Sequence, residues 1–172
     1  MAWVFSYGSL MGDNALRHYK GHPARLGGYR RSFNHLSTRR WGTTERPCPT
    51  LGLSPGGECW GVAWAIPRED EKEVRRTLER RLEDHESGAE YRRTTATVEL
   101  ATGREEAWVW LSRPEHADGA RWTDAAAFEQ ALRGAHGMVG TGVEYVRTLI
   151  HALDLWRIDD AMVRSLWGKL KP

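Results

Sequence analysis

The chain has 172 residues, 40% of them hydrophobic, and its 25 basic and 23 acidic residues leave a formal net charge of only +2. This size and composition fit one compact domain, which we expect to span residues 1–172, and argue against extended disorder. The two signs of charge are interleaved, as in residues 68–86, so the chain lacks the positive stripe that a phosphate backbone requires. We therefore expect no nucleic-acid partner.

The two cysteines and the chain's start bear on its environment. Cys48 and Cys59 form neither a Cys-x-x-Cys pair nor a disulfide framework, and no N-terminal signal or long apolar span is present. We expect a cytoplasmic protein with no membrane contact. The sequence leaves the oligomeric state open.

The first third of the chain has mostly strand character. Residues 2–7 form a short run rich in valine and aromatic residues, which is typical of a strand, whereas the polar residues 12–19 fit a short helix or loop. Residues 24–37 resemble a second strand, with a bulge or bend at Gly27 and Gly28. Residues 38–49 have no periodicity and end in two prolines, so we expect a long loop.

Two hairpins are expected next, on either side of a helix. Ser54-Pro55-Gly56-Gly57 is a turn signal that predicts a hairpin between strands at 50–53 and 57–66. A second hairpin is predicted between 90–100 and 104–111, with its turn at 101–104.

Helical patterns occupy two segments, one between the two hairpins and one at the end of the chain. In residues 68–86, Val74, Leu78 and Leu82 form a narrow apolar stripe on a charged helix. After Thr123 three more helical patterns follow, at 124–136, 142–155 and 159–170. This order of elements predicts an α+β domain around a mostly antiparallel, barrel-like sheet.

The turn Tyr7-Gly8-Ser9-Leu10 ends the first strand and is a candidate ligand site. It lacks the Gly-x-Ser-x-Gly spacing of a nucleophile elbow, so we do not expect Ser9 to act as a nucleophile. Gly8 instead lets a ligand approach the backbone closely, and the N–H groups from Gly8 to Leu10 could bind a carboxylate or an oxyanion. The alternative is an ordinary strand-to-helix turn.

Metal and cofactor sites find little support. His18 and His22 are four residues apart, but Gly21 and Pro23 interrupt the helix that would align them, and no third ligand lies nearby. Residues 137–142 lack the P-loop lysine and the dinucleotide spacing, so we expect a loop before the following helix, which could shape one wall of a pocket. We expect no metal and no cofactor.

Glu86 lies where the apolar stripe of the first helix gives way to Ser87 and Gly88. A carboxylate at that position can point into a cleft. A solvated helix end is the alternative, and the chemistry of the residues leaves both open.

Four segments together resemble a known family. VFSYGSLM (4–11), GGYRRSFNHLSTRRWGTTERP (27–47), PGGECWGVAWAIP (55–67) and GTGVEYVRTL (140–149) occur in the same order in ChaC-type γ-glutamylcyclotransferases. Four such matches in one order are far more specific than any single tetrapeptide. The resemblance implies the γ-glutamylcyclotransferase-like fold, a small α+β barrel.

The resemblance also implies a reaction. The α-amine of a γ-glutamyl group attacks its own γ-carbonyl, which forms 5-oxoproline and releases the attached amine or peptide without a nucleophile from the protein. By this resemblance Glu86 is the general base and acid, with Glu83 and Glu90 as alternatives. The same resemblance implies that Tyr7, Gly8, Ser9, Leu10 and Tyr145 line the γ-glutamyl pocket, with Arg40 as a weaker candidate for a carboxylate contact.

Because the chain departs from the family pattern at two places, the sequence does not determine which amine or peptide is released from the substrate. The turn is followed by Met-Gly-Asp-Asn instead of a tryptophan-containing segment, and the family's His-Arg-Gly is replaced here by Arg39-Arg40-Trp41-Gly42. The substrate could be glutathione, another γ-glutamyl peptide or a γ-glutamyl amine. A tailoring enzyme that removes a γ-glutamyl group from a biosynthetic intermediate, and a non-catalytic member that binds a small ligand or a protein, are the alternatives.

Overall fold

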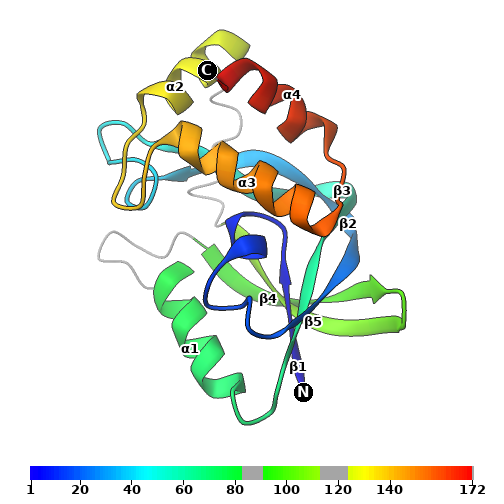
Figure 1. The fold of residues 1–172 in the computed structure, drawn as a ribbon. Helices are drawn as coiled ribbons and strands as arrows, with labels where there is room; N and C mark the ends of the chain where they lie inside the picture. The colour runs from blue at the N-terminus through cyan, green and yellow to red at the C-terminus, as the bar shows by residue number, and fades with distance from the viewer. Residues whose placement is uncertain (83–90, 113–123, 172) are drawn as a thin grey trace.

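The computed structural model describes residues 1–82, 91–112 and 124–171. These contain five strands, one short 3₁₀ helix and four α-helices (Figure 1). The elements are β1 (Ala2–Ser6), η1 (Ser9–Gly12), β2 (Lys20–Ser37), β3 (Cys48–Ile66), α1 (Glu71–Leu82), β4 (Tyr91–Leu100), β5 (Gly103–Ser112), α2 (Ala125–Gly134), α3 (Gly142–Trp156) and α4 (Ala161–Leu170).

The strands form a closed barrel in the order β1-β3-β2-β4-β5, which confirms the predicted α+β fold. The described pairings are antiparallel except the one between β1 and β5, where Trp3 lies opposite Ala107. Hence β1, β2 and β5 run in one direction, and β3 and β4 run in the other. The C-terminal ends of β1, β2 and β5 therefore meet the N-terminal ends of β3 and β4 at one end of the barrel.

The hairpin predicted within residues 50–66 is wrong. β3 is one continuous strand that pairs with β2 from Lys20↔Ala65 to Ser37↔Cys48. Gly56 and Gly57 do have positive φ angles, +89° and +77°, but they form a bulge in the ribbon rather than a reversal of the chain. The two glycines thus do mark an irregular point in the chain, but the pairing of β3 with β2 makes that point a bulge and not a turn.

The other bulge prediction is confirmed. The β2–β3 register shifts between Gly27 and Tyr29, where Gly28 (φ +81°) lies opposite the two glycines of β3. A second shift, between Ser32 and His35, places an extra residue on β2 instead. The ribbon formed by β2 and β3 can therefore bend at two places and still pair along its length.

The predicted helices and the second hairpin are confirmed within the described residues, whereas residues 83–86, the end of the first predicted helical pattern, lie outside them. Val74 and Leu78 of α1 are buried, and Leu82 packs against the core. The expected short helix or loop at 12–19 is a series of turns, since the 3₁₀ helix ends at Gly12. The expected loop from residue 38 is confirmed up to Pro47, because β3 begins at Cys48.

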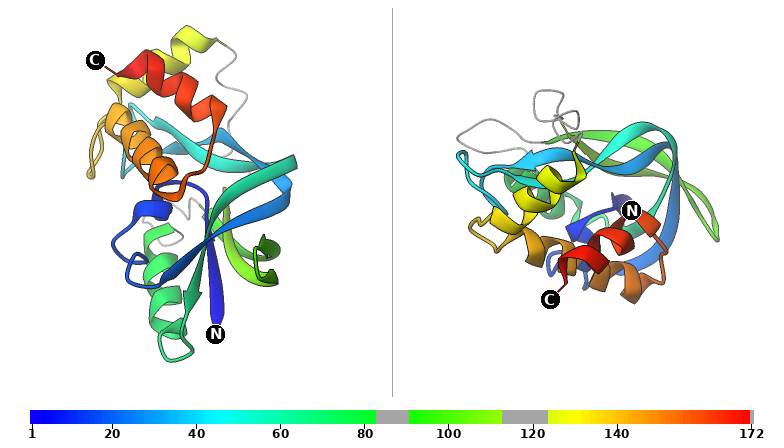
Figure 2. Two further views of the ribbon diagram at one scale, coloured as in Figure 1. Left: turned by 45° about the vertical axis from the view of Figure 1, so that its right-hand side comes forward. Right: turned by 90° about the horizontal axis from the view of Figure 1, so that it is seen from above.

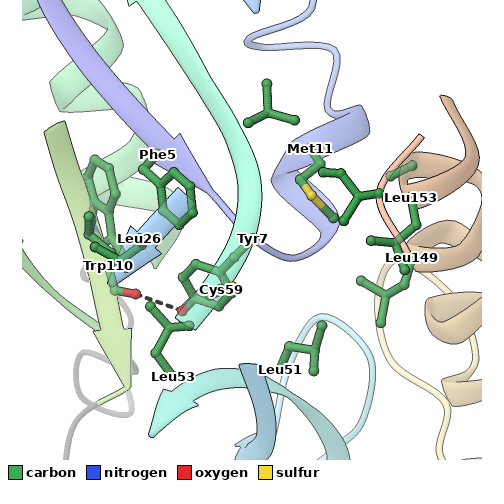
Figure 3. Close-up of a cluster of buried hydrophobic side chains, with 14 of the residues drawn as sticks. Phe5, Tyr7, Met11, Leu26, Leu51, Leu53, Cys59, Trp110, Leu149 and Leu153 are labelled. Atoms are coloured by element: carbon green, nitrogen blue, oxygen red, sulfur yellow. Dashed lines mark hydrogen bonds between the residues drawn. The ribbon is translucent and has the colours of Figure 1, made fainter. Parts of the chain in front are cut away.

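The C-terminal helices gather on one side of the molecule, while α1 lies apart from them against the barrel (Figures 1 and 2). α3 begins with a capping box, in which the Thr141 and Glu144 side chains each accept a hydrogen bond from the other residue's backbone N–H. Its apolar face packs beside the segment that follows β1, where Leu149 and Leu153 lie near Met11 (Figure 3). The core thus continues from the barrel into the helical layer.

Among the described helices, none has the length and apolarity that a membrane span requires.

Candidate active site

A pocket opens at the end of the barrel where the ends of all five strands meet, and α1 and α3 close its sides. The lining residues are Phe5, Ser6, Tyr7, Gly8, Ser9, Leu10, His35, Ser37, Arg40, Trp41, Thr50, Leu51, Arg81, Leu82, Tyr91, Trp110 and Tyr145. Six residues expected in the site from the sequence, Tyr7, Gly8, Ser9, Leu10, Arg40 and Tyr145, are brought together here.

The turn after β1 presents open backbone donors. The first hydrogen bond of η1 runs from the Met11 N–H to the Gly8 carbonyl (3.0 Å), so the three preceding N–H groups have no partner within the helix. Within the described part of the chain, the N–H groups of Gly8, Ser9 and Leu10 have no other acceptor. The turn therefore offers the donor cradle expected from the sequence.

Arg31 fixes the orientation of this turn from outside the pocket. Its Nε donates to the Tyr7 carbonyl (2.7 Å), and its other nitrogens bind the Asp160 carboxylate (2.6 Å) and the Trp60 carbonyl. In a trans peptide the carbonyl and the next N–H point in opposite directions. With the Tyr7 carbonyl held by Arg31, the Gly8 N–H points away from Arg31. Arg31 lies in the segment 27–47 that resembles the family, but no role was predicted for it, because burial and hydrogen-bond partners are not visible in the sequence.

Two buried tyrosines form fixed parts of the pocket. The Tyr7 hydroxyl donates to the Trp110 carbonyl (2.7 Å; Figure 3). The Tyr145 hydroxyl accepts from the Leu51 N–H (2.8 Å), and no described residue takes its own hydrogen. Burial, the largest cause, raises the pKa of each phenol far above its ordinary value. Both remain neutral near pH 7, so they act as hydrogen-bonding groups and not as bases.

The Tyr145 hydroxyl lies next to the donor turn. A methyl group added at Gly8 would come 4.0 Å from this oxygen and 3.9 Å from the Leu51 side chain. The hydroxyl hydrogen of Tyr145 is therefore one more donor beside the three open amides. The Tyr145 ring also packs against Trp41, with the ring centroids 5.2 Å apart.

Arg40 reaches the pocket from the loop between β2 and β3. It is half-buried, and the loop before α3 holds its backbone: the N–H groups of Met138 and Val139 donate to the carbonyls of Arg39 and Arg40 (2.9 and 2.8 Å). A Cβ at Gly137 would lie 2.5 Å from the Arg40 carbonyl, so this approach requires glycine. The loop expected at 137–142 is thus confirmed, and it supports the pocket wall from behind.

Glu86, with its alternatives Glu83 and Glu90, lies outside the described residues. The described residues that flank this segment, Leu82 and Tyr91, both line the pocket.

Several lining residues were not foreseen from the sequence. His35 is buried, and its Nδ1 is hydrogen-bonded to the Ser112 hydroxyl (2.8 Å). The centroids of the His35 and Tyr91 rings are 4.3 Å apart. The Tyr91 hydroxyl donates to the Leu51 carbonyl (3.1 Å). Thr50 was also missed. His35 and Thr50 lie opposite each other in the pairing of β2 with the first residues of β3, a pairing that the incorrect hairpin did not include.

The described regions can be compared with two other kinds of site, metal clusters and reactive thiols. No cluster of three or more potential metal ligands occurs in residues 1–82, 91–112 and 124–171. Burial raises the pKa of the Cys48 thiol to about 12 and that of Cys59 to about 11. Both thiols are therefore protonated and poorly nucleophilic at neutral pH.

Comparison with known proteins identifies the family and the fold. The model of the ChaC-like protein family matches residues 2–171. The chain belongs to the ChaC-like family. A glutathione-specific gamma-glutamylcyclotransferase of Escherichia coli strain K12 is 31% identical over 171 residues, which cover 98% of this chain and 72% of that protein. Gamma-glutamylcyclotransferase 2-3 of Arabidopsis thaliana is 27% identical over 181 residues, covering 98% of this chain and 88% of that one.

A solved structure shows the same fold. The crystal structure of a glutathione-specific γ-glutamyl cyclotransferase from yeast superposes with a TM-score of 0.83 at 21% sequence identity, covering 98% of this ChaC-like chain and 95% of the other. The barrel and the helices around it are therefore those of γ-glutamyl cyclotransferases.

Proposed function

We propose that this protein is a γ-glutamylcyclotransferase that converts glutathione to 5-oxoproline and cysteinylglycine. The observation that carries the proposal is membership of the ChaC-like family over residues 2–171, together with a relative that is named for glutathione. The open donors in the pocket support it, because the reaction places negative charge on the substrate. No cofactor takes part in the proposed chemistry.

The enzyme's main task in this reaction is to shape the substrate. The attacking amine and the γ-carbonyl belong to the same molecule, so the pocket must hold a flexible chain in a bent form ready to close a five-membered ring. Orientation of this kind supplies about 7–11 kcal/mol in well-ordered intramolecular reactions. A rigid pocket formed from five strand ends and two helices suits this task.

Protons must move during the reaction. The substrate's amine starts as an ammonium and ends as a lactam N–H, so it loses two protons. A base removes one proton to free the amine for attack, the second is lost as the ring forms, and an acid must protonate the leaving nitrogen. We assign the roles of base and acid to Glu86. Tyr7, Tyr145 and the two cysteines are unsuited to them, since burial raises each pKa and holds these groups neutral.

The donors in the pocket suit the developing charge. When the amine attacks, the γ-carbonyl oxygen becomes an oxyanion, and pre-oriented donors stabilise it. We assign this oxygen and the substrate α-carboxylate to the N–H groups of Gly8, Ser9 and Leu10 and to the hydroxyl of Tyr145. The half-buried Arg40 would attract a carboxylate of the substrate. Tyr7 shapes the pocket and carries the turn.

A panel of substrates tests the proposed activity. Purified protein is incubated with glutathione, with γ-glutamyl amino acids and with γ-glutamyl amines, and 5-oxoproline is measured for each. We expect the highest kcat/KM for glutathione. A clear preference for a γ-glutamyl amine would instead indicate a tailoring enzyme, and no product from any substrate would indicate a binding protein.

Variants test the assignment of the base. Glu86→Gln removes the titratable group at nearly constant size, so we expect turnover to fall by at least about 100-fold, the lower range for loss of a general acid or base. The melting temperature should stay unchanged. Glu83→Gln and Glu90→Gln are matched controls. Full activity in Glu86→Gln with a large loss in either control would move the base to that residue.

A further inference from the structure

Thr50 of β3 has a buried hydroxyl with no hydrogen-bond partner among the described residues. Its side chain is 3% exposed and lines the same pocket as the donor turn. Buried hydroxyls in folded proteins nearly always have partners, because an unpaired one loses its bonds to water and gains nothing in return. The neighbours of Thr50 show that the strand itself is well fixed. The N–H of Leu51 donates to Tyr145, and its carbonyl accepts from Tyr91.

The polar groups around Thr50 suggest which partner is missing. Three carbonyls of pocket residues are already engaged: that of Tyr7 by Arg31, that of Trp110 by Tyr7 and that of Leu51 by Tyr91. The open backbone groups, at Gly8 to Leu10, are donors. A γ-glutamyl head carries an α-carboxylate, which needs donors, and an α-amino group, which needs an acceptor. A threonine oxygen can accept a hydrogen bond.

We propose that the Thr50 hydroxyl oxygen accepts a hydrogen bond from the α-amino group of the substrate and selects ligands that carry this group. The proposal rests on the proposed function and adds a specificity-determining residue to it. Thr50 neither gains nor loses a proton. One N–H of the substrate bonds to its oxygen, so the amine is held while its C–N bond to the γ-carbon forms. As the bond between the γ-carbon and the leaving nitrogen breaks, the base passes one proton from the amine to that nitrogen, and the second proton that the ammonium loses goes to solvent.

Two variants and two ligands test this role. Thr50→Val removes the hydroxyl and keeps the shape of the side chain, whereas Thr50→Ser keeps the hydroxyl. The ligands are glutathione and desamino-glutathione, in which glutaryl replaces γ-glutamyl; the second has no α-amine and cannot cyclise. Glutathione turnover gives kcat and KM, inhibition by desamino-glutathione gives Ki, and calorimetry gives Kd for each ligand.

The expected result is selective. In Thr50→Val the KM and Kd for glutathione rise about tenfold, as for loss of one hydrogen bond to a charged group. The Ki of desamino-glutathione changes by less than about twofold, because that ligand has no amine to lose. Thr50→Ser stays within about threefold of the wild type for glutathione.

Thermal unfolding separates binding from a structural role. The ligand-free Thr50→Val variant should melt no lower than the wild type, since the lost hydroxyl bonds to no residue in 1–82, 91–112 and 124–171. Ser6→Ala is the contrasting control. The Ser6 hydroxyl donates to the Val62 carbonyl and accepts from the Trp64 indole (2.8 Å), so its removal should lower the melting temperature.

Three outcomes would overturn the proposal. They are unchanged glutathione binding in Thr50→Val, an equal loss for both ligands, and a lower melting temperature in the ligand-free variant. Failure of the proposed function is distinct, because the wild type would then make no 5-oxoproline. In that case calorimetry with glutathione still tests the amine contact, and absence of binding by the wild type would overturn both proposals.

Discussion

The pocket contains two sets of polar groups that differ in their partners. In one set the protein satisfies its own groups: Arg31 holds the Tyr7 carbonyl, and the hydroxyls of Tyr7 and Tyr145 are bonded to the backbone of β5 and β3. In the other, open set the groups have no partner among the described residues, namely the N–H groups of the turn after Tyr7 and the hydroxyl of Thr50. Both sets line or support the same pocket.

This difference separates scaffold from ligand contacts. Breaking a satisfied pair leaves a buried group unpaired, so it should destabilise the free protein. Removing an open group breaks no bond in the free protein, so it should affect only the bound state. The two sets thus predict opposite patterns of stability and activity.

Arg31→Ala should have the largest effect, because it breaks three contacts of the satisfied set. The Asp160 carboxylate loses its buried partner and the Tyr7 carbonyl is released, so we expect a loss of about 3–5 kcal/mol in the free energy of unfolding. Urea denaturation measures this. Arg164→Ala is a matched control, since its ion pairs with Asp154 and Asp159 are exposed and should contribute less than about 1 kcal/mol. Equal losses would contradict the account.

Ser9→Pro tests the open set, because it removes a single backbone donor. Proline is tolerated at the first position of a helix, so stability should change by less than about 1 kcal/mol. If the Ser9 N–H stabilises the oxyanion, kcat for 5-oxoproline formation should fall about 100-fold. Ser9→Ala keeps the N–H and loses only the hydroxyl. Equal activity in the two variants would remove this amide from the site.

Tyr145→Phe removes a group that belongs to both sets, since its oxygen is bonded and its hydrogen is open. The Leu51 N–H loses its acceptor, so we expect a loss of about 1–3 kcal/mol in unfolding free energy. Turnover should fall as well. Tyr29→Phe provides the control, because no described residue bonds to that hydroxyl. A destabilisation no larger than that of Tyr29→Phe would show that the Leu51 bond contributes little.

Alkaline pH should gradually lower the stability of the folded protein, because its buried thiols keep their protons while those of the unfolded chain lose them. Cys48 keeps its proton in the folded state up to a pKa of about 12, whereas the unfolded thiol loses its proton near 9.0. Above pH 9 the folded state therefore binds more protons, and stability falls by about 1.4 kcal/mol per pH unit for this thiol. Cys59 acts in the same direction. Urea unfolding between pH 8 and 11 should show a shallower decline in Cys48→Ala than in the wild type, and parallel curves would contradict this.

Local patterns predicted much of the fold. The stripe Val74, Leu78 and Leu82 predicted α1, and the short turn before Arg104 predicted the β4–β5 hairpin. The hairpin predicted at Ser54–Gly57 failed because its pattern is equally compatible with a bulge. The partner that decides between the two is β2, which lies far away in the sequence.

The site was predicted in part. The turn residues and Tyr145 were identified through their resemblance to a family and do line the pocket. Thr50 lies outside the four matching segments and Arg31 lies inside one of them, but no role was predicted for either. An arginine among many charges and a threonine in a strand look ordinary until burial and hydrogen-bond partners are known. Whether such a residue is scaffold or ligand contact depends on whether the fold satisfies it.

The most direct test of the account is the conversion of glutathione by the purified protein. Chromatography with mass detection would follow 5-oxoproline and cysteinylglycine over time. We predict that the two products appear in equal amounts and that glutathione disappears at the same rate. Intact glutathione after prolonged incubation with folded protein, or release of free glutamate in place of 5-oxoproline, would contradict the account.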